Sequence, residues 1–328
     1  MPTDVTIIVP VYNLEPYIRA SIASITAQQF EGTMEIIIVD DGSADKSLSA
    51  ARELQALDGR IRVISQRNSG VSVARNAGLE QATGRYILFV DGDDILRPNA
   101  VRALVDCISQ SKDAILACGD FVRIRSLAQE LPPAGSNPTY SDSDAVLKGI
   151  LLGEYGVSAC AKLFDREKIG ALRFCTGKRI NEDKYFLVQY LMLNRGTVVD
   201  LNDAIYGYYI RSGSVTNSPY SEKALDMIFF SERIQSEVAQ IKPELIEAAK
   251  YNNVTTHLAV LKKIIRSNMR KREADVYLKT RKRMLAVAKD LSPRQLRGHI
   301  GEVFVLKYFP PLYPLCVRIF YAVPAKHR

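Results

Sequence analysis

YILFVDGDD, residues 86–94, is an apolar run that ends in a glycine and three carboxylates. The run predicts a buried strand over residues 85–91, and the charges at its end need a partner. Clustered carboxylate oxygens suit a hard divalent cation such as Mg²⁺ or Mn²⁺, which commonly binds a diphosphate. For this segment alone, a strand-ending turn with hydrated aspartates is the competing interpretation.

The same pattern occurs earlier in the chain. Residues 35–39, Glu-Ile-Ile-Ile-Val, are followed by Asp40-Asp41-Gly42-Ser43. Two apolar strands that each deliver carboxylates at the C-terminal end indicate a ligand crevice in an open α/β sheet.

Composition narrows the class of protein. The chain has 328 residues, enough for one large domain or two ordinary ones. Its hydrophobic content of 47% and charged content of 24% are typical of a soluble globular protein. The net charge of +8 favours anionic partners, namely a nucleotide, a nucleic acid or an acidic membrane surface.

Cysteines and apolar stretches give further expectations. The five cysteines have no CxxC spacing, which argues against a zinc site or a disulfide framework and fits a reducing cytosol. The first residues contain no basic and apolar leader, so no signal peptide is expected. No stretch approaches roughly 18 uncharged apolar residues, so a conventional transmembrane helix is not expected either.

Strands and helices alternate over the first part of the chain. Strands are expected at 5–11, 35–40, 61–65, 85–91 and 114–123, and helices at 14–28, 46–57, 71–82 and 99–110. This alternation predicts an α/β fold, a mostly parallel sheet flanked by helices. After a loop at 131–138, helices are expected at 145–152 and 182–193, strands at 196–200 and 204–211, and helices from about Tyr220 onward.

Two loops between these elements could bind a nucleotide. Pro10 at the end of the first strand re-aims the chain, so that Tyr12 could stack on a base. Asn68-Ser69-Gly70 precedes a helix, and Arg75 lies one turn inside it, where helix N-terminus and guanidinium could both bind phosphate. A plain strand-to-helix turn and a capped helix with an exposed arginine are the alternatives.

Four segments carry a resemblance to a known family. They are residues 10–13 (PVYN), 39–43 (VDDGS), 68–70 with 74–76 (NSG and ARN), and 89–94 (FVDGDD). In this order and spacing they resemble the family 2 glycosyltransferases of the GT-A fold. The resemblance implies a nucleotide-diphosphate sugar donor, a metal bound at a DxD motif and inversion at the anomeric carbon.

The resemblance also assigns residues on the donor side. The nucleotide sugar would be held by Pro10, Tyr12, Asn13, Asp40, Asp41, Asn68 and Arg75. Asp91 and Asp93 match the DxD positions, with Asp91 near the ribose or the sugar and Asp93 on the Mn²⁺ or Mg²⁺ ion.

The acceptor side is similar to bacterial members of the family. The similar segments are 161–166, 172–174 and 181–186. By this resemblance Asp183 is the general base, and Glu182 orients it or touches the acceptor. Two acids are also common in the first turn of any helix. In residues 208–216, Arg211 and Ser214 look like the family's loop near the diphosphate, and an edge strand with an exposed turn is the alternative.

The last hundred or so residues lie outside the resemblance. Residues 258–283 contain ten Lys or Arg against two acids, and residues 303–316 are aromatic, apolar and broken by proline. Together they predict docking on an anionic membrane. A solvated helical bundle whose tail packs on its own core is the alternative. The three histidines are far apart and are expected to be structural.

The sequence thus predicts a GT-A glycosyltransferase domain over 1–217 and a basic helical region over 218–328. The expected reaction is inverting transfer from a UDP-sugar to a saccharide or lipid-linked saccharide of a bacterial surface polysaccharide. The enzyme is expected in the cytoplasm or on the inner face of the membrane. A nucleotidyltransferase, a basic nucleic-acid-binding protein and a non-catalytic sugar-nucleotide-binding module are the alternatives.

Overall fold

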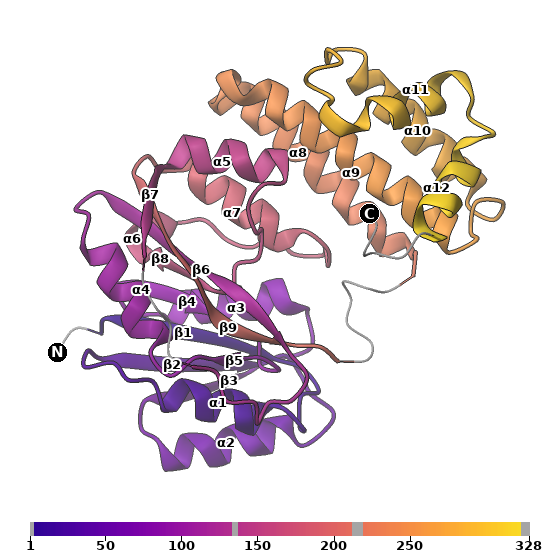
Figure 1. Cartoon of the computed structure of the whole chain (residues 1–328). Helices are drawn as coiled ribbons and strands as arrows, with labels where there is room; N and C mark the ends of the chain where they lie inside the picture. Colours follow the sequence, from indigo (N-terminus) through magenta and orange to yellow (C-terminus); the bar gives the residue numbers. More distant parts are fainter. Residues whose placement is uncertain (1–2, 133–136, 212–218, 323–328) are drawn as a thin grey trace. The chain divides into compact units, whose positions relative to one another are not determined.

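The computed structural model describes residues 3–132, 137–211 and 219–322, without the side chains of the last two residues of this range. The chain forms two compact units (Figure 1). The first comprises Met1–Leu147 with Gly156–Ser214, and the second comprises Lys148–Tyr155 with Val215–Arg328. The predicted boundary at residue 217 lies outside the described residues, so the functional division at that point stays a prediction.

The first unit is built on one sheet with the strand order β3-β2-β1-β4-β8-β6-β9-β5. Its first part is parallel and consists of β1 (Val5–Val11), β2 (Met34–Asp40), β3 (Ile61–Ser65) and β4 (Tyr86–Phe89). Every residue of β1 is buried. A central strand covered on both faces needs such a continuous apolar run, which is why the sequence predicted it well.

The other part of the sheet is mixed. It consists of β5 (Ile95–Leu96), β6 (Ala114–Ile124), β7 (Thr139–Asp142), β8 (Lys162–Asp165) and β9 (Thr197–Tyr209). β8 is antiparallel to both β4 and β6, whereas β6 and β9 are parallel with irregular register. The two strands predicted at 196–200 and 204–211 are therefore one strand, β9. The prediction missed β5, β7 and β8, because two to four residues are too few to show a hydrophobic period.

The first unit also contains helices, several of which pack against this sheet. The helices are α1 (Ile18–Thr26), α2 (Ser47–Leu57), α3 (Val71–Gln81), α4 (Ala100–Ser109), α5 (Ser143–Leu152, which runs into the second unit), α6 (Arg166–Ile169) and α7 (Glu182–Leu193). α3 packs on β1 and β2, and α4 packs on β6 and β9. The helix predicted from Leu14 starts only at Ile18. Pro16 disfavours a helical Glu15, and the loop is held instead by a hydrogen bond from Leu14 N to Ser47 Oγ of 2.8 Å.

An aromatic cluster holds the start of α7 close to the end of β4. Phe89 makes edge-to-face contacts with Phe164, Phe174 and Phe186. Phe174 and Phe186 stack with their centroids 4.0 Å apart. These buried rings bring the first turn of α7 to the turn that follows β4.

The second unit is helical and has its own core. Its helices are α8 (Leu225–Ile241), α9 (Ile246–Arg266), α10 (Ala274–Ala288), α11 (Ile300–Tyr308) and α12 (Tyr313–Ala322). Leu258, Leu261, Met284 and Leu306 are among the residues of this core. In the described part of the chain, no helix combines the length and the hydropathy that crossing a bilayer requires.

Candidate active site

The candidate site lies where the parallel strands β1, β2 and β4 end. Val11 pairs with Asp40 between β1 and β2, and Ile8 pairs with Phe89 between β1 and β4. The residues that follow these strands therefore share one edge of the sheet, as the sequence predicted. Pro10 is buried within β1, so its effect is to shape the strand end.

The loop after β1 is fastened to the loop after β2. Asn13 has a φ of 51°, which an asparagine tolerates better than most residues. Its backbone N–H donates to Ser43 Oγ at 3.0 Å, and its side-chain oxygen accepts from Ala44 N at 2.8 Å. The neighbouring Tyr12 is half exposed, which leaves its ring available to stack on a ligand.

The two acids at the end of β2 are buried and already hydrogen-bonded. Asp41 accepts from Ser69 N at 2.9 Å and from Gly70 N at 2.7 Å, and so fixes the loop that leads into α3. Asp40 accepts from Ser65 Oγ at 3.3 Å. Asn68 is exposed on this loop. The structure therefore gives Asp41 a clear positioning role toward the loop, and Asn68 is an accessible polar side chain on that loop.

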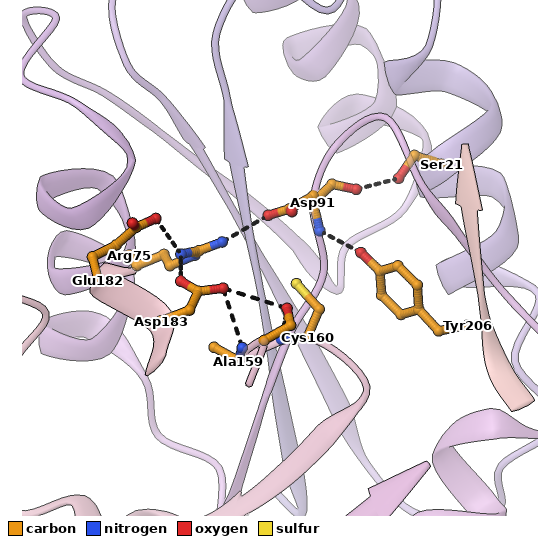
Figure 2. A network of polar contacts seen from close by, with 9 residues as sticks. Ser21, Arg75, Asp91, Ala159, Cys160, Glu182, Asp183 and Tyr206 are labelled. Atoms are coloured by element: carbon orange, nitrogen blue, oxygen red, sulfur yellow. Dashed lines mark hydrogen bonds and ion pairs between the residues drawn. The ribbon is translucent and has the colours of Figure 1, made fainter. Parts of the chain in front are cut away.

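Arg75 of α3 connects the two halves of the site (Figure 2). Its Nη2 lies 2.9 Å from Asp91 Oδ1 at the end of β4. Its Nη1 donates to Asp183 Oδ1 at the start of α7 and lies 3.7 Å from Glu182 Oε1. One guanidinium thus joins three carboxylates, two of them far away in the sequence.

The surroundings of Arg75 explain its charge. The residue is 3% exposed, and its guanidinium lies over the Phe174 ring with the Cζ atom 5.2 Å from the centroid. Burial alone would lower its pKa, but Asp183 and Asp91 outweigh burial and hold the pKa of Arg75 well above its usual value. Arg75 Nε is buried and has no hydrogen-bond partner among the described residues.

The acids at the start of α7 have different environments. Asp183 Oδ2 accepts from Ser158 Oγ at 3.3 Å and from Ala159 N at 3.2 Å, so three donors orient this carboxylate. Glu182 is more deeply buried. Burial, and then the charge of Asp183, raise the pKa of Glu182 to about 7.

The turn after β4 is held by its backbone. Asp91 N donates to Tyr206 Oη at 3.0 Å, and Ser21 Oγ donates to the Asp91 carbonyl at 3.5 Å (Figure 2). Asp93 Oδ2 lies 2.8 Å from Arg211 Nε. Asp94 accepts from Tyr209 N at 2.8 Å and therefore ties this turn to the end of β9.

The chemistry of the turn after β4 fits a hard cation. Burial and the charge of Asp91 raise the pKa of Asp93, which indicates negative charge that Arg211 balances only in part. Within the described residues, no three His, Cys, Asp or Glu side chains are arranged to hold a metal. Mg²⁺ commonly uses only one or two carboxylates together with substrate phosphates and water, so Asp93 and Asp91 are suitable in ligand type and number.

The structure adds residues that the sequence analysis did not select. They are Ser158 and Ala159 beside Asp183, Phe174 beneath Arg75, and Tyr206 and Ser21 beside Asp91. No short motif marks these contacts, because most join residues that are distant in the sequence. Ser214, expected near the diphosphate, lies outside the described residues.

Comparison with known proteins identifies related sequences. Residues 6–168 match the sequence profile of Glycosyl transferase family 2. Glycosyltransferase GlyA of Streptococcus pneumoniae is 34% identical over 242 residues, covering 70% of this chain and 34% of GlyA. This chain therefore spans about a third of the length of that relative. The succinoglycan biosynthesis protein ExoO of Rhizobium meliloti is 32% identical, covering 65% of this chain and 62% of ExoO.

Solved structures show the same fold. The S. aureus TarS 1–349 structure in complex with UDP-GlcNAc has a TM-score of 0.65 at 20% identity, covering 87% of this chain and 81% of that chain. The mannosyltransferase PcManGT from Pyrobaculum calidifontis, in complex with GDP-Man and Mn²⁺, has a TM-score of 0.56 at 16% identity, covering 97% and 88%.

The fold and the acid-lined edge of its sheet define a glycosyltransferase of the GT-A fold. Residues 6–168 of the chain belong to Glycosyl transferase family 2. The predicted family, fold class and enzyme class are thereby confirmed. Family membership favours a glycosyltransferase over a nucleotidyltransferase, a nucleic-acid-binding protein or a non-catalytic binding module.

Proposed function

We propose that this chain transfers a sugar from a UDP-sugar to an acceptor hydroxyl with inversion of the anomeric centre. The observation that carries the proposal is the link through Arg75 between Asp91 on the donor side and Asp183 on the acceptor side. This link supports the proposal because it joins Asp183, the proposed general base, to a carboxylate on the proposed donor side. The TarS structures with UDP and with UDP-GlcNAc support a uridine nucleotide as the donor.

The donor would lie along the ends of β1, β2 and β4. Tyr12 would stack on the base, and Asn68 would bind its polar edge or the ribose. Asp40, Asp41 and Asn13 would hold the surrounding loops in place, as their hydrogen bonds to those loops indicate. Arg211 and Ser214 would approach the diphosphate, with Arg211 exchanging its contact to Asp93 for a phosphate oxygen.

The transfer itself needs one displacement. The acceptor oxygen attacks the anomeric carbon as the bond from that carbon to the diphosphate oxygen breaks, and UDP leaves with the electron pair. Asp183 takes the proton of the acceptor hydroxyl. Three donors orient its carboxylate, which has about four lone-pair sites. One site is therefore left for a hydrogen bond from the hydroxyl group of the acceptor sugar.

A divalent cation would be held by Asp93 with Asp91, whose oxygen ligands suit Mn²⁺ or Mg²⁺. When bound, the cation supplies Lewis-acid stabilisation of the negative charge on the departing diphosphate. The Mn²⁺ in the PcManGT complex supports this assignment. Arg75 would keep Asp91 in position from the protein side.

The acceptor would be a saccharide of a bacterial surface polysaccharide. ExoO is named for succinoglycan biosynthesis, and TuaG of Bacillus subtilis, 29% identical over 225 residues, is named as a putative teichuronic acid biosynthesis glycosyltransferase. A lipid-linked saccharide would place the reaction at the inner face of the cell membrane.

A donor panel tests the proposal. The 328-residue chain is incubated with UDP- and GDP-sugars, with Mn²⁺ or Mg²⁺, and free nucleoside diphosphate and pyrophosphate are measured. Release of UDP from a UDP-sugar is the expected result. Release of pyrophosphate from a sugar phosphate and a nucleoside triphosphate would identify a nucleotidyltransferase instead. The anomeric configuration of the product, read by NMR coupling constants, tests inversion.

A further inference from the structure

The last two helices of the chain expose an unusual amount of apolar surface. The outward apolar side chains of the two helices and of the segment that connects them, which we call the α11–α12 apolar surface, are Ile300, Phe304, Tyr308, Phe309, Leu312, Leu315, Ile319 and Phe320. Phe304 is 52% exposed and Ile319 is 59% exposed. Exposed apolar side chains gathered this densely indicate a binding surface.

Each of the two helices is apolar on two sides. Val303 and Leu306 of α11, and Tyr313 and Val317 of α12, are buried in the core of the helical unit. The exposed stripe of α11 repeats every four residues, at Ile300, Phe304 and Tyr308, on a different side of the helix. The buried side of each helix therefore supplies the apolar side chains that pack into the core of the helical unit. Packing of the tail on that core does not explain the apolar side chains on the exposed side.

A partly buried carboxylate, Glu302, links α11 to α9 and to α12. Glu302 accepts from Lys262 Nζ at 2.8 Å on α9 and from Tyr313 Oη at 2.7 Å on α12. Burial opposes the charge, but the hydrogen bonds from His299, Lys262 and Tyr313 prevail and lower the pKa of Glu302 to about 2. The only acid within residues 297–320 is thus used internally.

Several positively charged side chains lie on or beside the α11–α12 apolar surface. Lys307 lies over the Tyr308 ring at 4.9 Å, and Arg318 donates to Asn268 Oδ1 at 2.9 Å. Asn268 immediately precedes the turn that carries Arg270, Lys271 and Arg272, all of them exposed. Other cations of the basic stretch bind within the unit, as Arg281 does to the Leu306 carbonyl at 2.7 Å, so only part of that stretch can meet a partner.

We infer that the α11–α12 apolar surface inserts into the interface of an anionic lipid bilayer, with Lys307, Arg318 and the basic turn 270–272 on the phosphates of the headgroups. Helices of nine and ten residues are too short to span a bilayer but long enough to lie in its interface. A second copy of the chain is a poorer partner, because its identical positive rim would repel. The inference rests on the proposed function in one respect, namely that binding to the bilayer would give the enzyme access to a lipid-linked acceptor.

The absence of tryptophan from the sequence permits a specific test. Single tryptophans are introduced in the 328-residue chain as Phe304→Trp and Ile319→Trp. The matched control is Leu278→Trp on α10, since Leu278 is exposed in the same unit. Vesicles contain phosphatidylglycerol or only phosphatidylcholine. With the anionic vesicles at low salt, emission should move to shorter wavelength and be quenched by brominated lipid for Phe304→Trp and Ile319→Trp but not for Leu278→Trp.

A second variant links the surface to binding strength. Phe304→Ser combined with Leu315→Ser and Ile319→Ser should weaken co-sedimentation with anionic vesicles by roughly tenfold or more, with unchanged far-ultraviolet circular dichroism. UDP release from a water-soluble donor should be unaffected, so failure of the glycosyltransferase assignment and failure of the membrane inference give different results. The inference would be overturned by equal binding to phosphatidylcholine vesicles or by a lack of response of Phe304→Trp to lipid. A shift in emission that needs no lipid and grows with protein concentration would also overturn it, because it would identify a protein–protein interface.

Discussion

Arg75 Nη2 lies 2.9 Å from Asp91 Oδ1, and the same buried guanidinium binds Asp183. A turn at the end of β4 and the first turn of α7 are thereby held by a single cation. Removing one partner of a buried ion pair leaves the others desolvated without compensation, which costs far more than breaking an exposed pair. The link therefore affects stability as well as the proposed chemistry.

Arg75→Met should lower the free energy of unfolding by about 3–5 kcal/mol, because Asp91, Asp183 and Glu182 lose their shared counter-charge. The matched control is Arg102→Met, which removes an exposed arginine that pairs with Asp106 across one helical turn. That variant should change stability by less than about 1 kcal/mol. Urea denaturation followed by circular dichroism measures both. Similar small changes in the two variants would contradict a central role for Arg75.

Asp183→Asn should reduce kcat by about 10²–10⁴-fold, because the amide keeps the shape of the side chain but cannot take the acceptor proton. Donor affinity, measured by calorimetry, should change by less than about tenfold, or roughly 1.4 kcal/mol. Glu182→Gln is the matched comparison and should retain more of the turnover. The reverse order of the two variants would assign the proton transfer to Glu182.

Stability should depend on pH through Glu182. Its pKa is raised from an ordinary 4.5 to about 7, so between these values the folded chain binds more protons than the unfolded chain. The contribution of Glu182 to the free energy of unfolding is therefore most favourable below about pH 4.5, and it falls as the pH rises toward 7. The slope is at most about 1.4 kcal/mol per pH unit for one proton. Glu182→Gln should flatten the profile, whereas Glu80→Gln, at an exposed position of α3, should leave it unchanged.

Asp93→Ala should abolish metal-dependent turnover and leave the fold intact, because this carboxylate is the proposed ligand of the cation and takes no part in the Arg75 network. Turnover is measured against Mn²⁺ concentration, and melting is followed separately. Asp106→Ala, at an exposed position of α4, serves as the control for loss of an aspartate. Near-normal turnover of Asp93→Ala over the Mn²⁺ series would refute the metal assignment.

Gly42→Ala should weaken donor binding and lower stability. Gly42 has a φ of +71°, and a Cβ atom there would lie 2.7 Å from Asn68 N, so the loop carrying Asn68 must shift. The left-handed conformation alone costs a residue with a side chain roughly 1–2 kcal/mol. Gly59→Ala is the control, because no atom lies within 4 Å of its added Cβ. Donor affinity and melting temperature should change only in Gly42→Ala, and unchanged donor affinity there would separate this loop from the donor site.

The parallel part of the sheet and its carboxylates could be predicted from the sequence. β2 and β4 are almost entirely buried, so each appears as an apolar run, and the acids come at its end, with Asp40 as the last residue of β2 and Asp91 shortly after β4. The short antiparallel strands could not be predicted in the same way. β8, of four residues, exists because β4 and β6 flank it, and this pairing brings Ala159 close to Asp183.

By itself the sequence determined the order of the motifs, and hence the family, because strand runs and the acids that end them are local in the chain. Only the tertiary structure decided which charges meet. Arg75 and Asp183 are 108 positions apart, and no local pattern relates them. The α11–α12 apolar surface likewise depends on the tertiary structure. Composition gives the number of apolar side chains, whereas packing against α9 and α10 determines which of them remain exposed to solvent.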